Sequence, residues 1–305
     1  MTAAPSGTQY PIAHGDYRAT VVEVGGGIRL LDAAGVALVQ GYALDRVCDG
    51  ARGQLLVPWP NRIEDGAYSF GGSRWQLAIT EPSSGCAIHG LTRWATWTRV
   101  DQRADRVTLA HRLHPQPGWP GLLDLTVTYE LSDRGLSVAL DAHNVGPTAV
   151  PFGAGAHPYL VAADDGPVDE WTLELGASSV LTTDDCGIPS GRSDVSGTVH
   201  DFRTPRRIGP TTLDDPFTDL ARGDDGTAVA TLTGPSGHGV ALWADAHHRW
   251  FQVFTGDALA DPTRRRTAVA IEPMTCPPNA FRTGEDLIEL EPDERLTIRW
   301  GVGAV

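Results

Sequence analysis

The side chains best suited to acid–base chemistry lie in five short polar clusters, each set in apolar, proline-rich or glycine-rich surroundings. Each cluster places a carboxylate, imidazole, amide or guanidinium beside rigid or small residues, as a site for a hydroxylated ligand requires. The clusters are Pro58-Trp59-Pro60-Asn61-Arg62-Ile63, Ala87-Ile88-His89-Gly90, Gly153-Ala154-Gly155-Ala156-His157-Pro158-Tyr159, Leu213-Asp214-Asp215-Pro216-Phe217 and Val269-Ala270-Ile271-Glu272-Pro273-Met274.

Glu272 is the strongest candidate for a general base. It ends an apolar run that begins at Val269, so we expect its side chain to be buried. Burial raises the pKa of a carboxyl group, and a raised pKa suits proton abstraction near neutral pH. A structural alternative is open at this point, in which a buried Glu272 simply pairs with Arg62.

His157 and His89 supply the imidazoles. Small residues before His157 leave space above its ring, and Pro158 restricts the backbone after it. His89 precedes Gly90, where a backbone can approach a ligand closely. The alternatives are a tight turn at His157 and a hydrogen-bonded core histidine at His89.

Asn61, Arg62 and Asp214 are candidates for holding a ligand rather than for moving protons. The amide and the guanidinium would present fixed donors, and the carboxylate would accept hydrogen bonds from hydroxyl groups. The structural alternatives are a surface ion pair at Arg62 and a turn that begins at Asp214-Asp215.

Metal-binding and cofactor-binding motifs are not found beside these clusters. Neighbouring histidines such as His247 and His248 point to opposite faces of a strand and have no suitably spaced acidic or thiol partner. The Gly25-Gly26-Gly27 run lacks the third glycine of a dinucleotide fingerprint, because Leu30 stands there. We therefore expect no metal and no cofactor.

Short strands must position the clusters. The 35 glycines and 22 prolines interrupt the chain too often for long helices. Apolar and polar residues alternate over residues 107–113, 125–131, 136–142 and 296–300, as in strands with one buried face. Because no segment carries the apolar stripe of a helix, the sequence predicts an all-β fold.

The domain organisation follows from the absence of long linkers and internal repeats. We predict one large antiparallel β-sandwich over residues 1–305. Residues 1–15 have the character of a loose N-terminal segment.

Composition narrows the partners and the location. A net charge of −14 would repel nucleic acids and anionic membranes. No run of about 18 apolar residues and no signal-peptide pattern is found, so we expect a cytoplasmic protein. The four scattered cysteines form no CxxC pair. The sequence identifies no oligomeric partner.

Taken together, the clusters resemble the aldose 1-epimerase, or galactose mutarotase, family. The motifs Asn61-Arg62-Ile63, His89-Gly90, His157-Pro158-Tyr159, Asp214-x-x-Phe217 and Glu272-Pro273 occur in the family's order and rough spacing. The resemblance covers about residues 20–300, and the segments 58–63 and 272–278 look like a bacterial branch. One position departs from the family pattern, because Leu91 stands where the family has a second glycine.

The resemblance implies a β-supersandwich and an isomerase that interconverts the α and β anomers of a hexose without a cofactor. It implies that Glu272 is the general base and His157 the general acid. It implies that His89, Arg62 and Asp214 hold the sugar, with Asn61 beside them. With reference pKa values of about 4.3 and 6.5, modest shifts would leave this carboxylate ionised and this imidazole protonated near neutral pH.

Two other functions are open on the sequence alone. An epimerase of a phosphorylated or sulfonated sugar would need a pocket cation such as Arg93. A non-catalytic carbohydrate-binding protein would not need an acid–base pair. A two-carboxylate glycosidase is disfavoured, because Glu272 and His157 are not a carboxylate pair.

Overall fold

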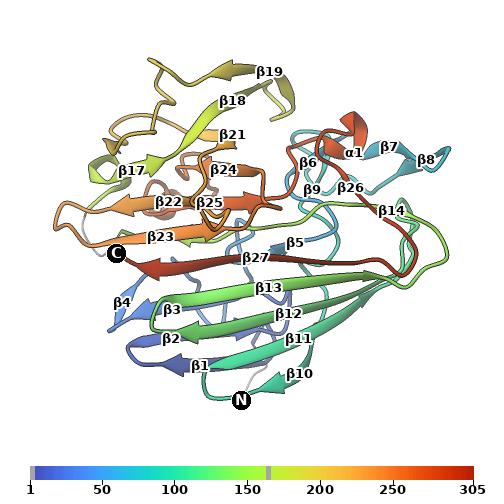
Figure 1. Cartoon of the computed structure of the whole chain (residues 1–305), viewed down its shortest axis with the longest axis horizontal. Coiled ribbons are helices and arrows are strands. Elements are labelled where there is room, and N and C mark those ends of the chain that lie inside the picture. The colour runs from blue at the N-terminus through green and yellow to red at the C-terminus, as the bar shows by residue number, and fades with distance from the viewer. Residues whose placement is uncertain (1–3, 163–165) are drawn as a thin grey trace.

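Antiparallel strands dominate the structure, a computed structural model that describes residues 4–162 and 166–305 (Figure 1). The helical segments of the described chain are α1 (Ala280–Thr283), η1 (Val168–Glu170) and η2 (Pro262–Arg264). All of them are far too short to span a bilayer. The predicted all-β architecture is confirmed.

The largest sheet has nine strands and contains the four segments in which apolar and polar residues alternate. In β12, every second residue from Leu123 to Leu131 is buried and the residues between are partly or fully exposed. Its order is β10 (Thr98–Gln102), β11 (Arg106–Leu113), β12 (Leu123–Ser132), β13 (Gly135–Asn144), β27 (Arg295–Ala304), β23 (Gly239–Ala244), β22 (Ala228–Thr233), β17 (Thr172–Leu175), β20 (Arg206–Arg207).

The second sheet has eight shorter strands and carries most of the polar clusters. Its order is β19 (Pro189–Asp194), β18 (Ala177–Thr183), β21 (Asp214–Leu220), β24 (Trp250–Phe254), β25 (Val269–Met274), β15 (Gly155–Ala156), β5 (Leu55–Leu56), with β16 (Tyr159–Leu160) also paired to β25. All six residues of β25 are buried, as expected for a strand that is covered on both faces.

Four smaller sheets complete the fold. The first has four strands in the order β1 (Gln9–His14), β2 (Tyr17–Val22), β3 (Ile28–Ala33), β4 (Val36–Ala37). The other three are two-stranded: β14 (Val150–Phe152) with β26 (Ile288–Leu290), β6 (Arg62–Glu64) with β9 (Cys86–Ile88), and β7 (Ala67–Phe70) with β8 (Ser73–Gln76). Strands β1 and β2 contact β12, so the first sheet covers part of the nine-stranded sheet. One hydrophobic cluster, from Tyr10 to Val302, includes side chains from both large sheets.

Two local expectations are wrong. The segment 1–15 is not loose from Gln9 onward, because β1 pairs with β2 along its whole length and buries Tyr10 and Ile12. Residues 1–3 lie outside the described part of the chain. Asp214 and Asp215 begin strand β21 rather than a turn, because they pair with Phe254 and Val253 of β24. A single domain over 1–305 stays a prediction.

Candidate active site

Glu272 lies inside β25, opposite Gln252 of β24. Its residue is only 2% exposed. Burial raises the pKa of the Glu272 carboxyl well above its ordinary value, and the nearby Asp214 carboxylate adds to the rise. The structure thus agrees with the sequence in giving this strand a buried carboxyl group with a raised pKa.

His157 lies between β15 and β16 and is fixed by its own backbone. Its N–H donates to the carbonyl of Gln54 at 3.1 Å, and its carbonyl accepts from the N–H of Gly53 at 2.8 Å. Burial lowers the pKa of the imidazole to about 3, and the Arg93 guanidinium adds to that effect. The ring of Tyr159 stacks on the imidazole with centroids 4.9 Å apart.

Glu272 and His157 meet directly, with Oε1 of the carboxyl group 3.3 Å from Nε2 of the imidazole. Glu272 Oε2 and His157 Nδ1 are buried and have no hydrogen-bond partner in the part of the chain that the structure describes. Both pKa shifts favour the neutral forms. The sequence analysis expects modest shifts that leave Glu272 ionised and His157 protonated, whereas burial shifts both pKa values strongly in the opposite direction.

His89 faces the same pair from a tight corner after β9. It has a φ of 61°, and Gly90 follows with a φ of 73°. A Cβ at Gly90 would lie 2.1 Å from the carbonyl oxygen of Val57, so this corner requires glycine. His89 Nδ1 accepts a hydrogen bond from the N–H of Asn61 at 3.1 Å. In the neutral ring, Nε2 then carries the hydrogen and can donate it to a ligand.

Arg62 makes an ion pair, as in its structural alternative, but the partner is Glu81 and both side chains are mostly buried. Its Nε and Nη2 donate to the two carboxylate oxygens of Glu81 at 2.6 and 3.0 Å. The Ser84 hydroxyl also donates to Glu81. The alternative in which Arg62 pairs with Glu272 is wrong. Arg62 lines the pocket as part of a bidentate ion pair with Glu81, which fixes the position of its guanidinium.

Asp214 and Asn61 line the pocket with Arg62 and His89. Gln252 Nε2 donates to Asp214 Oδ1 at 2.7 Å, which orients the carboxylate at the start of β21. The side-chain oxygen of Asn61 accepts from the N–H of Arg62 at 2.9 Å. Asn61 therefore acts on the site chiefly through its backbone and its φ of 53°.

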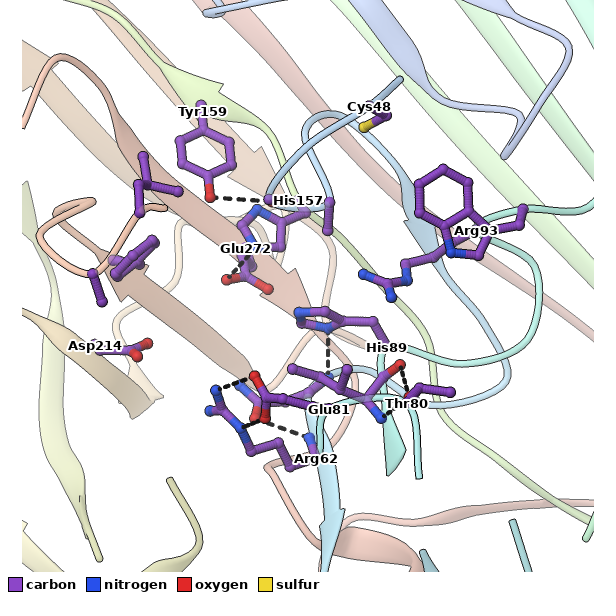
Figure 2. A pocket seen from close by; sticks show the side chains of 18 residues that line it. Cys48, Arg62, Thr80, Glu81, His89, Arg93, His157, Tyr159, Asp214 and Glu272 are labelled. Atoms are coloured by element: carbon purple, nitrogen blue, oxygen red, sulfur yellow. Dashed lines mark hydrogen bonds and ion pairs between the residues drawn. The ribbon is translucent and has the colours of Figure 1, made fainter. Parts of the chain in front are cut away.

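The residues surround a cavity of about 350 Å³ (Figure 2). All six predicted site residues line it. The donor atoms of His89, His157 and Glu272 lie within 4.8 Å of one another. Two imidazoles and a carboxylate are ligands that zinc accepts, so metal dependence has to be tested directly.

Glu81 and Gln252 are the site residues that sequence reasoning missed. Gln252 is the one polar residue of β24, whose sequence is Trp-Phe-Gln-Val-Phe, and this interruption is a usable clue. Glu81 lies in a polar loop between Thr80 and Pro82, where no local feature distinguishes it from a solvated surface residue.

Comparisons with known proteins agree with this geometry. The sequence matches the aldose 1-epimerase family over residues 8–301. It is 37% identical over 288 residues to the uncharacterized protein YihR of Escherichia coli K12, covering 94% of this chain and 90% of YihR. That identity extends over nearly the whole of both chains.

Solved structures show the same fold. A putative aldose 1-epimerase from Escherichia coli K12 superposes with a TM-score of 0.84 at 21% identity, covering 98% of this chain and 99% of the other. A GalM/aldose epimerase homologue from C. elegans gives 0.85 at 19% identity, with 98% of each chain covered. The predicted galactose mutarotase-like β-sandwich is confirmed. With a family match over nearly its whole length, this chain belongs to the aldose 1-epimerase family.

Proposed function

We propose that the protein interconverts the α and β anomers of a hexose by acid–base opening and closure of the sugar ring. The observation that carries this proposal is the 3.3 Å contact between Glu272 and His157 inside a buried pocket. Such a pair can remove a proton from the hydroxyl oxygen of a hemiacetal carbon and deliver a proton to its ring oxygen. The family match supports the reaction class.

The number of protons that the Glu272–His157 pair exchanges fits this reaction. Ring opening removes a proton from the C1 hydroxyl and adds one to the ring oxygen, and closure reverses both steps. The resemblance assigns the base to Glu272 and the acid to His157. Burial keeps the pair's single proton on Glu272 in the resting protein. Transfer of that proton to His157 across the short contact produces the state in which these roles operate, without a proton from solvent.

The remaining groups would hold the sugar while the opened chain rotates about C1–C2. His89 offers Nε2–H, and the Arg62–Glu81 pair and Asp214 offer donors and acceptors on the side of β6 and β21 (Figure 2). Their partners within the protein fix their positions before the sugar arrives. A fixed geometry lowers the entropic cost of reaching the transition state.

Polarimetry of freshly dissolved α-glucose, α-galactose and an anionic hexose tests the proposal. We expect acceleration over the spontaneous rate, retained in the presence of EDTA. Binding without acceleration of any sugar would favour a non-catalytic carbohydrate-binding protein. Loss of activity on chelation, restored by zinc, would show that His89, His157 and Glu272 hold a metal ion.

A second candidate function, epimerisation of an anionic sugar, is favoured by Arg93. Its guanidinium lines the pocket and points toward it (Figure 2). Within residues 4–162 and 166–305, no carboxylate lies at ion-pair distance from it, and burial lowers its pKa. A partly buried cation without a carboxylate partner is stabilised when a phosphate, sulfonate or carboxylate group binds.

Arg93→Met separates the two substrates. If the natural substrate is anionic, the variant lowers kcat/KM for an anionic hexose by about 10²-fold, and far more than for its neutral counterpart. An equal effect on both hexoses would leave the neutral hexose as the proposed substrate.

The proposed setting is the cytoplasm, with a small sugar as the partner. The net charge of −14 argues against nucleic-acid and anionic-membrane partners. The measurement that addresses location is fractionation of cells that produce the protein.

A further inference from the structure

A buried cation lies behind the candidate active site, outside the residues that line the pocket. The Arg52 side chain is 1% exposed. Its Nη1 donates to Gln40 Oε1 at 2.6 Å, and its Nε lies 3.4 Å from Asp49 Oδ1. Its guanidinium carbon lies 4.0 Å from the centroid of the Tyr159 ring. Burying a guanidinium is costly, so this position calls for a role.

Arg52 and His157 occupy opposite faces of the Tyr159 ring. The imidazole centroid is 4.9 Å from the tyrosine centroid, and the two planes differ by 17°. A guanidinium and an imidazole both stacked this closely cannot share one face. The three side chains therefore form a stack in the order Arg52, Tyr159, His157, and the two contact distances of 4.0 and 4.9 Å limit the separation of cation and imidazole to about 9 Å at most.

The local backbone explains why this stack forms. His157 and Tyr159 are two residues apart, so in an extended chain their side chains point the same way. The N–H of Gln40 donates to the carbonyl of Tyr159 at 2.8 Å. Gln40 thus holds Tyr159 through its backbone and Arg52 through its side chain.

The stack orients the His157 imidazole, as a hydrogen bond does at many functional histidines. Such an imidazole is usually oriented by a partner on its second ring nitrogen. Among the described residues, no other residue makes a hydrogen bond with His157 Nδ1. Its plane is instead set by Tyr159 on one side and by the edge contact with His89, 5.3 Å between centroids.

Four titratable or charged groups face His157. Glu272 approaches from β25, His89 and Arg93 from the segment after β9, and Arg52 from behind Tyr159. The two arginines oppose a positive charge on the imidazole. Arg52 differs from Arg93 because no ligand in the pocket can reach it.

We infer that Arg52 is a positioning residue for the proposed reaction, acting on the orientation and charge of His157 through the ring of Tyr159. The inference rests on the proposed function for its kinetic consequence. Its structural part, the coupling of Arg52 to His157, stands independently of turnover.

The test compares Arg52→Gln, which removes the charge, with Arg52→Lys, which keeps a cation over the ring. In Arg52→Gln we expect the pKa of His157 to rise by about one, since a cation within about 9 Å of the imidazole is lost. The acid limb of the kcat/KM profile should move to higher pH by the same amount, and kcat should fall about tenfold with little change in KM. Arg52→Lys should restore most of both.

Ring ¹⁵N shifts of His157, recorded from pH 2 to 7, bracket its pKa of about 3 and give a readout that does not need turnover. Arg264→Gln is the matched control, because Arg264 also pairs with Asp49 but lies outside the stack. It should leave the titration of His157 unchanged. If Arg52→Gln does not fold, Tyr159→Leu removes the intervening ring and should change the His157 titration instead.

The outcomes are distinct. An unchanged His157 titration in folded Arg52→Gln and Tyr159→Leu overturns the inference. Equal losses in Arg52→Gln and Arg52→Lys, with no change in the pH profile, also overturn it by showing a purely structural role. A shifted titration in a protein that accelerates no sugar keeps the coupling and rejects the proposed function.

Discussion

Polar side chains are exposed to water in strand β12 of the nine-stranded sheet but buried in strand β25 of the eight-stranded sheet. In β12, buried residues alternate with partly or fully exposed ones, so the polar side chains reach water. In β25, all six residues are buried, and Glu272 Oε2 has no hydrogen-bond partner within residues 4–162 and 166–305. Gln252 Oε1 on neighbouring β24 is also buried and unpaired.

This difference indicates that the nine-stranded sheet mainly stabilises the fold, whereas the eight-stranded sheet carries the groups of the candidate site. A buried polar atom without a partner costs about 1–3 kcal/mol. The eight-stranded sheet accepts this cost where the candidate site lies. The nine-stranded sheet contributes regular pairing and apolar burial to the shared core. Substitutions in the two sheets should therefore have different consequences.

The largest expected effect is the loss of turnover in Glu272→Gln. The amide keeps the shape of the side chain but cannot exchange the proton, and acid–base groups typically contribute about 10²–10⁴-fold to the rate. Polarimetric kcat measures the loss. The same change at exposed Glu130 of β12 is the control and should leave kcat unchanged. Normal turnover in folded Glu272→Gln would remove Glu272 from the mechanism.

The next effect separates the two histidines of the site. We expect His157→Asn to lower kcat by about 10²-fold, because proton transfer acts in the transition state. His89→Asn should act mainly by raising KM, because a positioning group binds ground state and transition state alike. Michaelis–Menten analysis of both variants decides, and the reverse pattern would exchange their roles.

A cavity in the other sheet should change stability and leave chemistry intact. Leu140 of β13 is 2% exposed. Replacing a buried leucine by alanine costs about 2–5 kcal/mol. Urea unfolding should show this loss in Leu140→Ala, while kcat at 25 °C stays at the wild-type value. A parallel loss of kcat would mean that the two sheets are not functionally separate.

The pH profile should reflect the neutral resting pair. Burial lowers the pKa of His157 to about 3 and raises that of Glu272 well above its ordinary value. The form of the Glu272–His157 pair that carries one exchangeable proton is therefore populated between these two pKa values. The kcat/KM value should fall at low pH as His157 gains a proton and at high pH as Glu272 loses one, about tenfold per pH unit beyond each limb. A fall that begins near the ordinary imidazole pKa would contradict these shifts.

The smallest effect is a gain in stability from Glu272→Gln. The unfolded carboxyl ionises above about pH 4.3, whereas the buried one stays protonated to higher pH. The raised pKa therefore stabilises the fold below the unfolded pKa, and this stabilisation is lost as the pH rises. Glutamine does not titrate, so Tm should exceed that of the wild type by about 2–4 °C at pH 8 and by less at pH 5.

The sequence predicts the regular sheet far better than the site. The alternation in residues 107–113, 125–131 and 136–142 identifies β11, β12 and β13, because a two-residue period survives in any half-buried strand. The six predicted site residues, all of which line the pocket, were found through short motifs and a family resemblance. Their separate roles stay predictions.

The parts that sequence reasoning missed depend on long-range contacts. Arg62 and Glu81 are 19 residues apart, and nothing local predicts that they pair. The resting charge of Glu272 and His157 depends on how completely other strands cover them, which no local pattern contains. The pairing of β1 with β2 was missed for a simpler reason, because a short strand near the N-terminus was taken for a loose end.

The position of β27 in the nine-stranded sheet has a consequence for how the chain folds during synthesis. This strand joins β13 on one side to β23 on the other, yet it is the last strand of the sheet in chain order. About 150 residues separate the end of β13 from the start of β27. At about 5–20 residues per second, the ribosome needs roughly 8–30 s to make them. During that time β13 has an unpaired edge, which makes this interval the one in which a chaperone or a wrong partner can bind.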